Sequence, residues 1–160
     1  MKEKLISKDM VRGIHPIFRS RIGDRLIKIL FAISGVNKVN RIYDSSKHMT
    51  GLDFVNGILN YMGIVYKTKN YEVLDQFAGQ PFITVSNHPY GHVDGIIAIS
   101  AVAGKRRDYK MMVNWMLSQI DTMDEHFIGV NPYSKDNKMS ELKSSVAGVK
   151  QCLGHLKDGH

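Results

Sequence analysis

The sequence lacks the features that mark secreted and membrane-spanning proteins. Its 160 residues include a single cysteine, Cys152, so no internal disulfide can form and a reducing compartment is expected. No apolar run approaches the roughly 20 residues that span a bilayer, because the longest candidate, Leu26–Ser34, is short and contains Lys28. The opening Met-Lys-Glu-Lys has no apolar segment behind it, so no signal peptide is expected. Repeats and low-complexity segments are also missing, and we expect a cytoplasmic globular protein.

Positive charge, in contrast, is in excess. Lysine and arginine number 22 against 15 acidic residues, which gives a net charge of +7. This balance favours an acidic partner, such as nucleic acid, anionic lipid headgroups or an acidic carrier protein. Arg21, Arg25 and Lys28 flank an apolar stripe in a helix expected after Ser20, which is typical either of a membrane-surface helix or of one packed on its own core. Nucleic acid is disfavoured because the basic residues are scattered and no aromatic-basic recognition motif is present.

Hydrophobic periodicity predicts an α/β fold, with a mixed sheet flanked by helices and a helical N-terminal part. Residues 1–48 are expected to form a basic helical segment, and residues 49–160 an α/β domain. The expected strands are Ile64–Tyr66, Pro81–Val85, Tyr109–Val113 and Phe127–Val130. The last expected helix closes at Gly159, where an α/β pattern would next return to the sheet. The pattern therefore predicts a domain truncated at its C-terminus.

A polar cluster follows the predicted strand Pro81–Val85. It is Ser-Asn-His-Pro-Tyr-Gly-His-Val-Asp, residues 86–94, and an apolar run begins at Ile96. Polar residues at the end of a buried strand are a common place for chemistry in α/β proteins. A histidine can take a proton near neutral pH, and a nearby carboxylate fixes its tautomer and stabilises its charge. His88 is therefore the candidate base, and Asp94 the residue that orients it.

A second imidazole in the cluster leaves other functions open. His88 and His92 are four residues apart, which suits two metal ligands on one helix face with Asp94 as a third. Pro89 and Gly91 lie between them and disfavour a regular helix there, so we expect no metal. A metal-dependent hydrolase remains the alternative function, beside a non-enzymatic basic binding domain.

Residues 87–95, Asn-His-Pro-x-Gly-x-x-Asp-Gly, also carry a resemblance. They resemble the first block of the glycerolipid acyltransferase superfamily, the lysophosphatidate acyltransferase-like enzymes, whose usual form is His-x4-Asp. The longer spacing here, with Pro after the His and Gly after the Asp, is similar to the hemolysin-like branch, which includes acyltransferases of ornithine and glycine lipids. The resemblance implies transfer of a fatty acyl group from a carrier-protein or coenzyme A thioester to a lyso-lipid. It implies no cofactor and a location at the inner face of the cell membrane.

The resemblance further directs attention to residues that bind substrate. Phe127–Tyr133 occupies the place of the family's second block, where an Arg commonly holds the acceptor phosphate. Asn131 stands here instead, which disfavours a simple glycerol phosphate acceptor. The basic turn Lys105–Arg107 suits an acidic carrier protein or lipid phosphates. The substrate-binding candidates are Asn87, Tyr90, Gly91, His92, Lys105, Arg106, Arg107 and Asn131.

The family's Phe-Pro-x-Gly-type block, which follows the last helix in related sequences, has no counterpart here. The chain is therefore expected to be catalytically incomplete. A sheet edge left uncovered in this way keeps unpaired backbone groups, so we also expect a homodimer.

Overall fold

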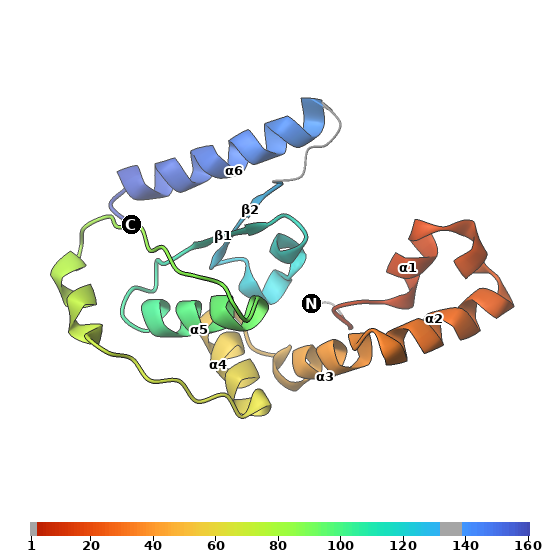
Figure 1. Ribbon diagram of the computed structural model, residues 1–160. Helices are drawn as coiled ribbons and strands as arrows, with labels where there is room; N and C mark the ends of the chain where they lie inside the picture. The colour runs from red at the N-terminus through yellow and green to blue at the C-terminus, as the bar shows by residue number, and fades with distance from the viewer. Residues whose placement is uncertain (1–2, 132–138) are drawn as a thin grey trace. The chain divides into compact units, whose positions relative to one another are not determined.

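The computed structural model describes residues 3–131 and 139–160, and for Ile14, Arg21 and residues 139–144 it describes the backbone alone. The chain divides into two compact units, Met1–His48 and Met49–His160. Figure 1 shows the order of the elements in each.

The first unit is helical. It contains α1 (Lys8–Ile14), a 3-10 turn (Pro16–Arg19), α2 (Arg21–Ile33) and α3 (Val36–Ser46). Serine caps begin two of the helices: the Ser7 side chain accepts a hydrogen bond from Met10 N–H, and Ser20 accepts one from Gly23 N–H. These bonds satisfy backbone donors that a helix start leaves free. Ile27 and Phe31 of α2 supply the core of this unit.

Helices also cover much of the second unit. They are α4 (Gly51–Met62), a 3-10 segment (Tyr71–Phe77), α5 (His92–Ala103), two short 3-10 turns (Leu117–Gln119 and Asp121–Met123) and α6 (Met139–Lys157). Helix α4 buries Phe54, Val55, Ile58 and Leu59. It packs against α5, where the Ser100 hydroxyl donates to the Asn56 side-chain oxygen at 2.7 Å.

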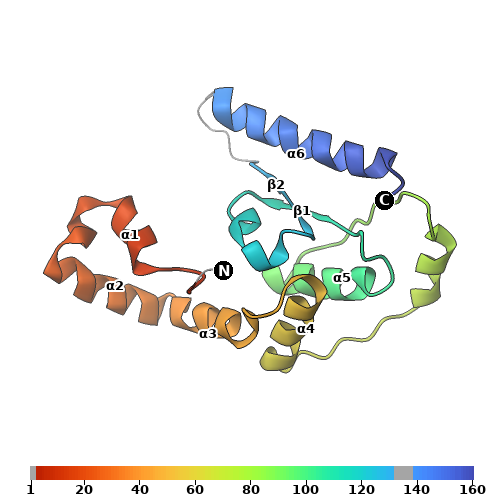
Figure 2. The same cartoon turned by 180° about the vertical axis from the view of Figure 1, so that it is seen from behind.

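A small parallel sheet lies under α6. Strand β1 (Met111–Asn114) pairs with β2 (Phe127–Val130), with Met111 opposite Phe127. Helix α6 lies against β2 in both views (Figure 1 and Figure 2). The predicted α/β class is thus confirmed, with helices that outweigh the sheet. Within the residues that the structure describes, no helix is long and apolar enough to cross a membrane.

Two of the four strand predictions were wrong. Ile64–Tyr66 and Pro81–Val85 lie outside the described sheet, which contains β1 and β2. The apolar side chains that suggested the second of these are largely in solvent, with Ile83 73% and Val85 93% exposed. Alternating apolar residues permit a strand, but a strand forms only where its backbone groups find a neighbouring ladder. Segment 81–85 instead contacts the residues before β1 through side chains. Thr84 Oγ1 lies 2.8 Å from the hydroxyl of Tyr109.

Candidate functional site

The polar cluster occupies a sharp turn from the extended segment 81–88 into helix α5. The turn spans Pro89–Gly91, and α5 begins at His92. Gly91 has φ +62° and ψ −129°, a backbone conformation that a side chain would strain. The chain therefore reverses at Gly91, and His88 comes to lie beside the first turn of the helix.

The structure brings His88 and Asp94 together. The distance from His88 Nδ1 to Asp94 Oδ2 is 3.7 Å, longer than a hydrogen bond but within reach of an ion pair. Asp94 is held in place by the turn, because Tyr90 N–H donates to Asp94 Oδ2 at 2.7 Å and Asp94 N–H donates to the Gly91 carbonyl at 3.1 Å. The His88 side chain is 63% exposed and that of Asp94 19%. A fixed carboxylate beside an accessible imidazole suits a general base whose contacts tighten when substrate binds.

The other residues of the cluster surround this pair. Asn87 and Tyr90 are exposed in the turn, and His92 is exposed at the first position of α5. Among the described residues, no group of three or more His, Cys, Asp or Glu side chains could hold a metal ion. His88, His92 and Asp94 thus do not converge as a ligand set, and the metal-dependent hydrolase gains no support.

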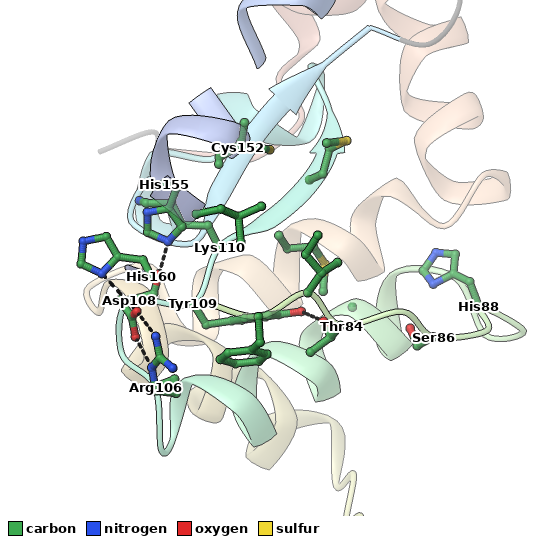
Figure 3. Close-up of a pocket in the computed structure, with 17 residues that line it drawn as sticks. Thr84, Ser86, His88, Arg106, Asp108, Tyr109, Lys110, Cys152, His155 and His160 are labelled. Carbon is green, nitrogen blue, oxygen red and sulfur yellow. Dashed lines mark hydrogen bonds and ion pairs between the residues drawn. The ribbon is translucent and has the colours of Figure 1, made fainter. Parts of the chain in front are cut away.

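A cavity of about 440 Å³ opens between segment 82–88, β1 and the end of α6. Figure 3 shows His88 at one end of it, and Asp108 and His160 at the other. Apolar side chains form most of the wall between these ends. The residues that line it are Phe82, Ile83, Thr84, Ser86, His88, Gly95, Arg106, Asp108, Tyr109, Lys110, Met111, Met112, Ile128, Cys152, His155, Leu156 and His160.

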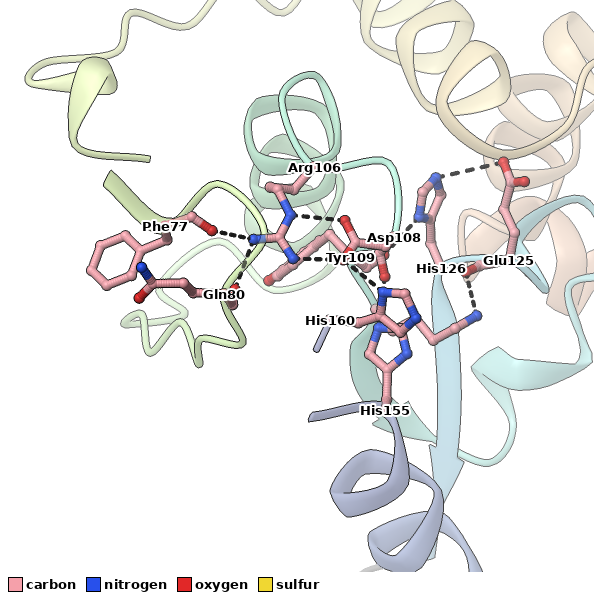
Figure 4. Close-up of polar contacts among 10 residues, drawn as sticks. Phe77, Gln80, Arg106, Asp108, Tyr109, Glu125, His126, His155 and His160 are labelled. Atoms are coloured by element: carbon pink, nitrogen blue, oxygen red, sulfur yellow. Dashed lines mark hydrogen bonds and ion pairs between the residues drawn. The ribbon is translucent and has the colours of Figure 1, made fainter. Parts of the chain in front are cut away.

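Arg106, predicted to bind substrate, is engaged within the protein. Its guanidinium donates to both Asp108 oxygens, at 3.0 and 2.6 Å, and to the carbonyls of Phe77 and Gln80 at 2.7 and 2.9 Å (Figure 4). The hydrogen bond from Arg106 lowers the pKa of Asp108 from 3.8 to about 2. Arg106 therefore ties residues 77–80 to Asp108, in the segment that precedes β1.

Lys105 also has a partner inside the protein. Its ammonium lies 2.6 Å from Asp75 Oδ1 and 4.5 Å from the centre of the Tyr71 ring. The neighbouring Arg107 is exposed. The basic turn predicted from Lys105–Arg107 therefore has much of its charge matched within the molecule.

Several residues of the cavity were not predicted. His155 Nε2 donates to the Asp108 carbonyl at 2.7 Å, and His160 Nδ1 lies 3.2 Å from Asp108 Oδ2. The two imidazole rings stack with centres 4.7 Å apart. No local sequence pattern predicts this cluster of His155, His160 and Asp108, because the end of α6 contacts Asp108 only in the tertiary fold.

Asn131, a predicted substrate-binding residue, follows β2 and its carbonyl accepts a hydrogen bond from the Ser145 hydroxyl. Lys135 and Lys138, which follow Asn131 in the sequence and could supply a cation to the acceptor, lie outside the described residues.

Comparison with known proteins gives one family. Residues 18–143 match the family model described as Acyltransferase, a range that covers the turn 86–94 and both strands. No curated protein and no solved structure matches the chain.

Proposed function

Since this chain belongs to the acyltransferase family whose model it matches, we propose that it moves a fatty acyl group to a lyso-lipid in lipid biosynthesis. The donor is an acyl carrier protein or coenzyme A thioester, and the acceptor is other than a simple glycerol phosphate. The observation that carries the proposal is the His88–Asp94 pair, 3.7 Å apart on the turn into α5. The sequence of that turn supports the hemolysin-like branch of the superfamily.

The geometry suggests how the pair would act. His88 Nδ1 faces Asp94, which leaves Nε2 to take the proton from the acceptor's hydroxyl or amine. As that proton leaves, the acceptor's oxygen or nitrogen bonds to the thioester carbonyl carbon, and the carbonyl π electrons move onto its oxygen. The tetrahedral oxyanion then collapses to a new carbonyl, and the carbon–sulfur bond breaks. The thiolate leaves and recovers the proton from the imidazolium. Asp94 stabilises that imidazolium, and neither a cofactor nor a covalent enzyme intermediate is required.

The cavity beside His88 offers room for an acyl chain. Its volume of about 440 Å³ lies in the range of small-molecule sites. Phe82, Met111 and Ile128 contribute apolar wall, while His88 lies at one end. An acyl chain within this cavity would place its carbonyl near the imidazole.

We further propose that the protein works at an anionic membrane surface. Helix α2 leaves one apolar face in solvent, where Ile22 is 72% and Ile33 81% exposed, with Ile29 between them at 54%. Arg25 and Lys28 are exposed on the same helix. Apolar area beside cations is the combination that binds peripheral helices to anionic lipid. Arg21 belongs to the predicted set, but its side chain lies outside the described residues.

The test is acyl transfer by a full-length version of the protein from both donors to lyso-aminolipid and to glycerol 3-phosphate. His88→Ala should lower transfer by at least about 100-fold, the usual cost of losing a general base. His48→Ala removes an exposed histidine from the first unit and should leave transfer unchanged. If His88→Ala retains near-normal transfer while His92→Ala loses it, the base is His92 and the assignment to His88 is wrong. Transfer to glycerol 3-phosphate alone would overturn the proposed acceptor class.

A further inference from the structure

The first unit contains a small cavity whose lining is strongly basic. Its volume is about 150 Å³, room for about five water molecules. Three lysines, two asparagines and one phenylalanine line it, and no acidic residue is among the described residues of the lining. The lining residues are Lys4, Lys8, Lys28, Phe31, Asn37 and Asn40.

The side chain of a buried asparagine helps to form this cavity. Asn40, 7% exposed on α3, accepts a hydrogen bond from Ile6 N–H and donates one to the Ile6 carbonyl, both at 2.9 Å. The two bonds fasten the segment before α1 to α3. Lys4 and Lys8, on either side of Ile6, are thereby brought to the same cavity as Lys28 of α2. The fold adds Lys28 to Lys4 and Lys8, since only Lys28 is distant from the other two in the sequence.

One carboxylate near these lysines is paired with an arginine. Asp24 lies one helical turn before Lys28, but Arg12 Nη2 donates to Asp24 Oδ1 at 2.6 Å. That hydrogen bond is the main cause of the lowered pKa of Asp24, and the charges of Lys8 and Lys28 add to it. Arg12 also pairs with Asp9 at 2.8 Å. Three lysines therefore line one cavity, while Asp24 and Asp9 are paired with Arg12.

We propose that this cavity is a binding site for a phosphate group. Ammonium groups are strong phosphate ligands, and three of them around one small space would offset a dianion that none could hold alone. The exposed Asn37 amide can add a neutral donor, and Phe31 closes the wall. The phosphate is carried either by a lipid headgroup or by a soluble phosphate ester. In the first case the site deepens the proposed membrane association and rests on it, but it needs no acyl transfer.

The first experiment titrates inorganic phosphate into isotope-labelled protein at constant ionic strength and follows the backbone amides by NMR. Saturable shifts at residues 4–8, 28 and 37 are expected. Lys4→Gln/Lys8→Gln should weaken this binding at least about tenfold, as the loss of two cations near an anion implies, and Lys4→Arg/Lys8→Arg should restore most of it. The matched control, Lys67→Gln/Lys69→Gln, removes the same charge from two exposed positions of the second unit. Shifts scattered over the basic surface, or equal losses in both glutamine pairs, would overturn the site.

The second experiment identifies the source of the phosphate. Phosphatidylcholine vesicles carry either phosphatidic acid or a fatty acid carboxylate, matched in surface charge. A preference for phosphatidic acid that Lys4→Gln/Lys8→Gln abolishes identifies a headgroup. Equal binding to both vesicles, with saturable binding of free phosphate, identifies a soluble ester. Acyl transfer to a detergent-dispersed acceptor should survive in the same variant, so failure of the site and failure of the proposed enzyme are distinguishable.

Discussion

The Asp94 carboxylate is held in one position by the backbone of its own turn. One of its oxygens accepts the Tyr90 N–H while facing His88 Nδ1. The carboxylate is thus fixed by backbone, and only the imidazole has to move to close the 3.7 Å gap. The residue types and their spacing were predictable from the sequence, because both lie within one turn. Their contact required Gly91 at a positive φ, which the sequence could only allow.

Asp94→Asn tests whether the charge or only the hydrogen bond matters. The amide oxygen can still accept the Tyr90 N–H, but it no longer stabilises a protonated imidazole. We expect transfer to fall by roughly 10²–10⁴-fold with the fold intact, measured as kcat/KM and by circular dichroism. Asp53→Asn, at an exposed position of α4, is the matched control. Unchanged transfer in Asp94→Asn would remove Asp94 from the mechanism.

Asp108 gives a prediction about acid stability. The Arg106 hydrogen bond lowers its pKa from 3.8 to about 2, so its contribution is fully present above pH 4 and is lost as the pH falls through 2. That contribution is up to about 2 kcal/mol of unfolding free energy. Urea unfolding of the native chain and Asp108→Asn between pH 2 and 6 should give curves that differ above pH 4 and converge at pH 2. A constant difference at every pH would contradict it.

Helices and strands differ in how much of them the sequence could reveal. Helix α2 was predictable from its apolar stripe and its Ser20 cap, and α4 ends at Gly63 with φ +65° as its glycine suggested. Both signals are local. Segment 81–85 had an equally clear apolar pattern, but a strand needs a partner that periodicity does not name. The cavity beside His88 could not be predicted for the same reason, because segment 82–88 and residues 152–160, which both line it, are distant in the sequence.

The contact between α6 and β2 depends on a glycine. A Cβ at Gly148 would lie 2.5 Å from the Gly129 carbonyl oxygen and 2.7 Å from Val130 Cγ1. Gly148→Ala should therefore lower the unfolding free energy by about 1–3 kcal/mol, although alanine favours helix. Gly154 lies in the same helix with open space around it, and Gly154→Ala should raise stability by up to about 1 kcal/mol. Denaturant unfolding of the two variants measures the difference, and equal effects of the same sign would exclude a close approach.

At the scale of the whole molecule, charge and exposed apolar area are the quantities that decide its partners. The net charge of +7 and the exposed face of α2 support attachment to an anionic surface. The unpaired segment 81–85, with Ile83 and Val85 in solvent, supports self-association as well. These two tendencies can be separated, because they involve different units of the chain.

Vesicle binding should depend on both salt and the α2 face. The electrostatic part weakens as salt shortens the Debye length to about 8 Å at physiological ionic strength, so co-sedimentation with anionic vesicles should decrease between 20 and about 300 mM salt. Ile29→Ser/Ile33→Ser should reduce binding at every salt concentration. Val65→Ser/Val73→Ser removes exposed apolar area from the second unit and serves as control. Equal binding to neutral and anionic vesicles at all salt levels would exclude the electrostatic part.

The single cysteine of the chain lies in the wall of the larger cavity. Burial raises the pKa of the Cys152 thiol, so little thiolate is present at neutral pH and alkylation is slow. An acyl chain or headgroup that fills the cavity would cover this sulfur further. The alkylation rate of Cys152 in the unaltered chain, followed by mass spectrometry, therefore reports whether the cavity is occupied. The measurement requires neither a label nor an assay of turnover.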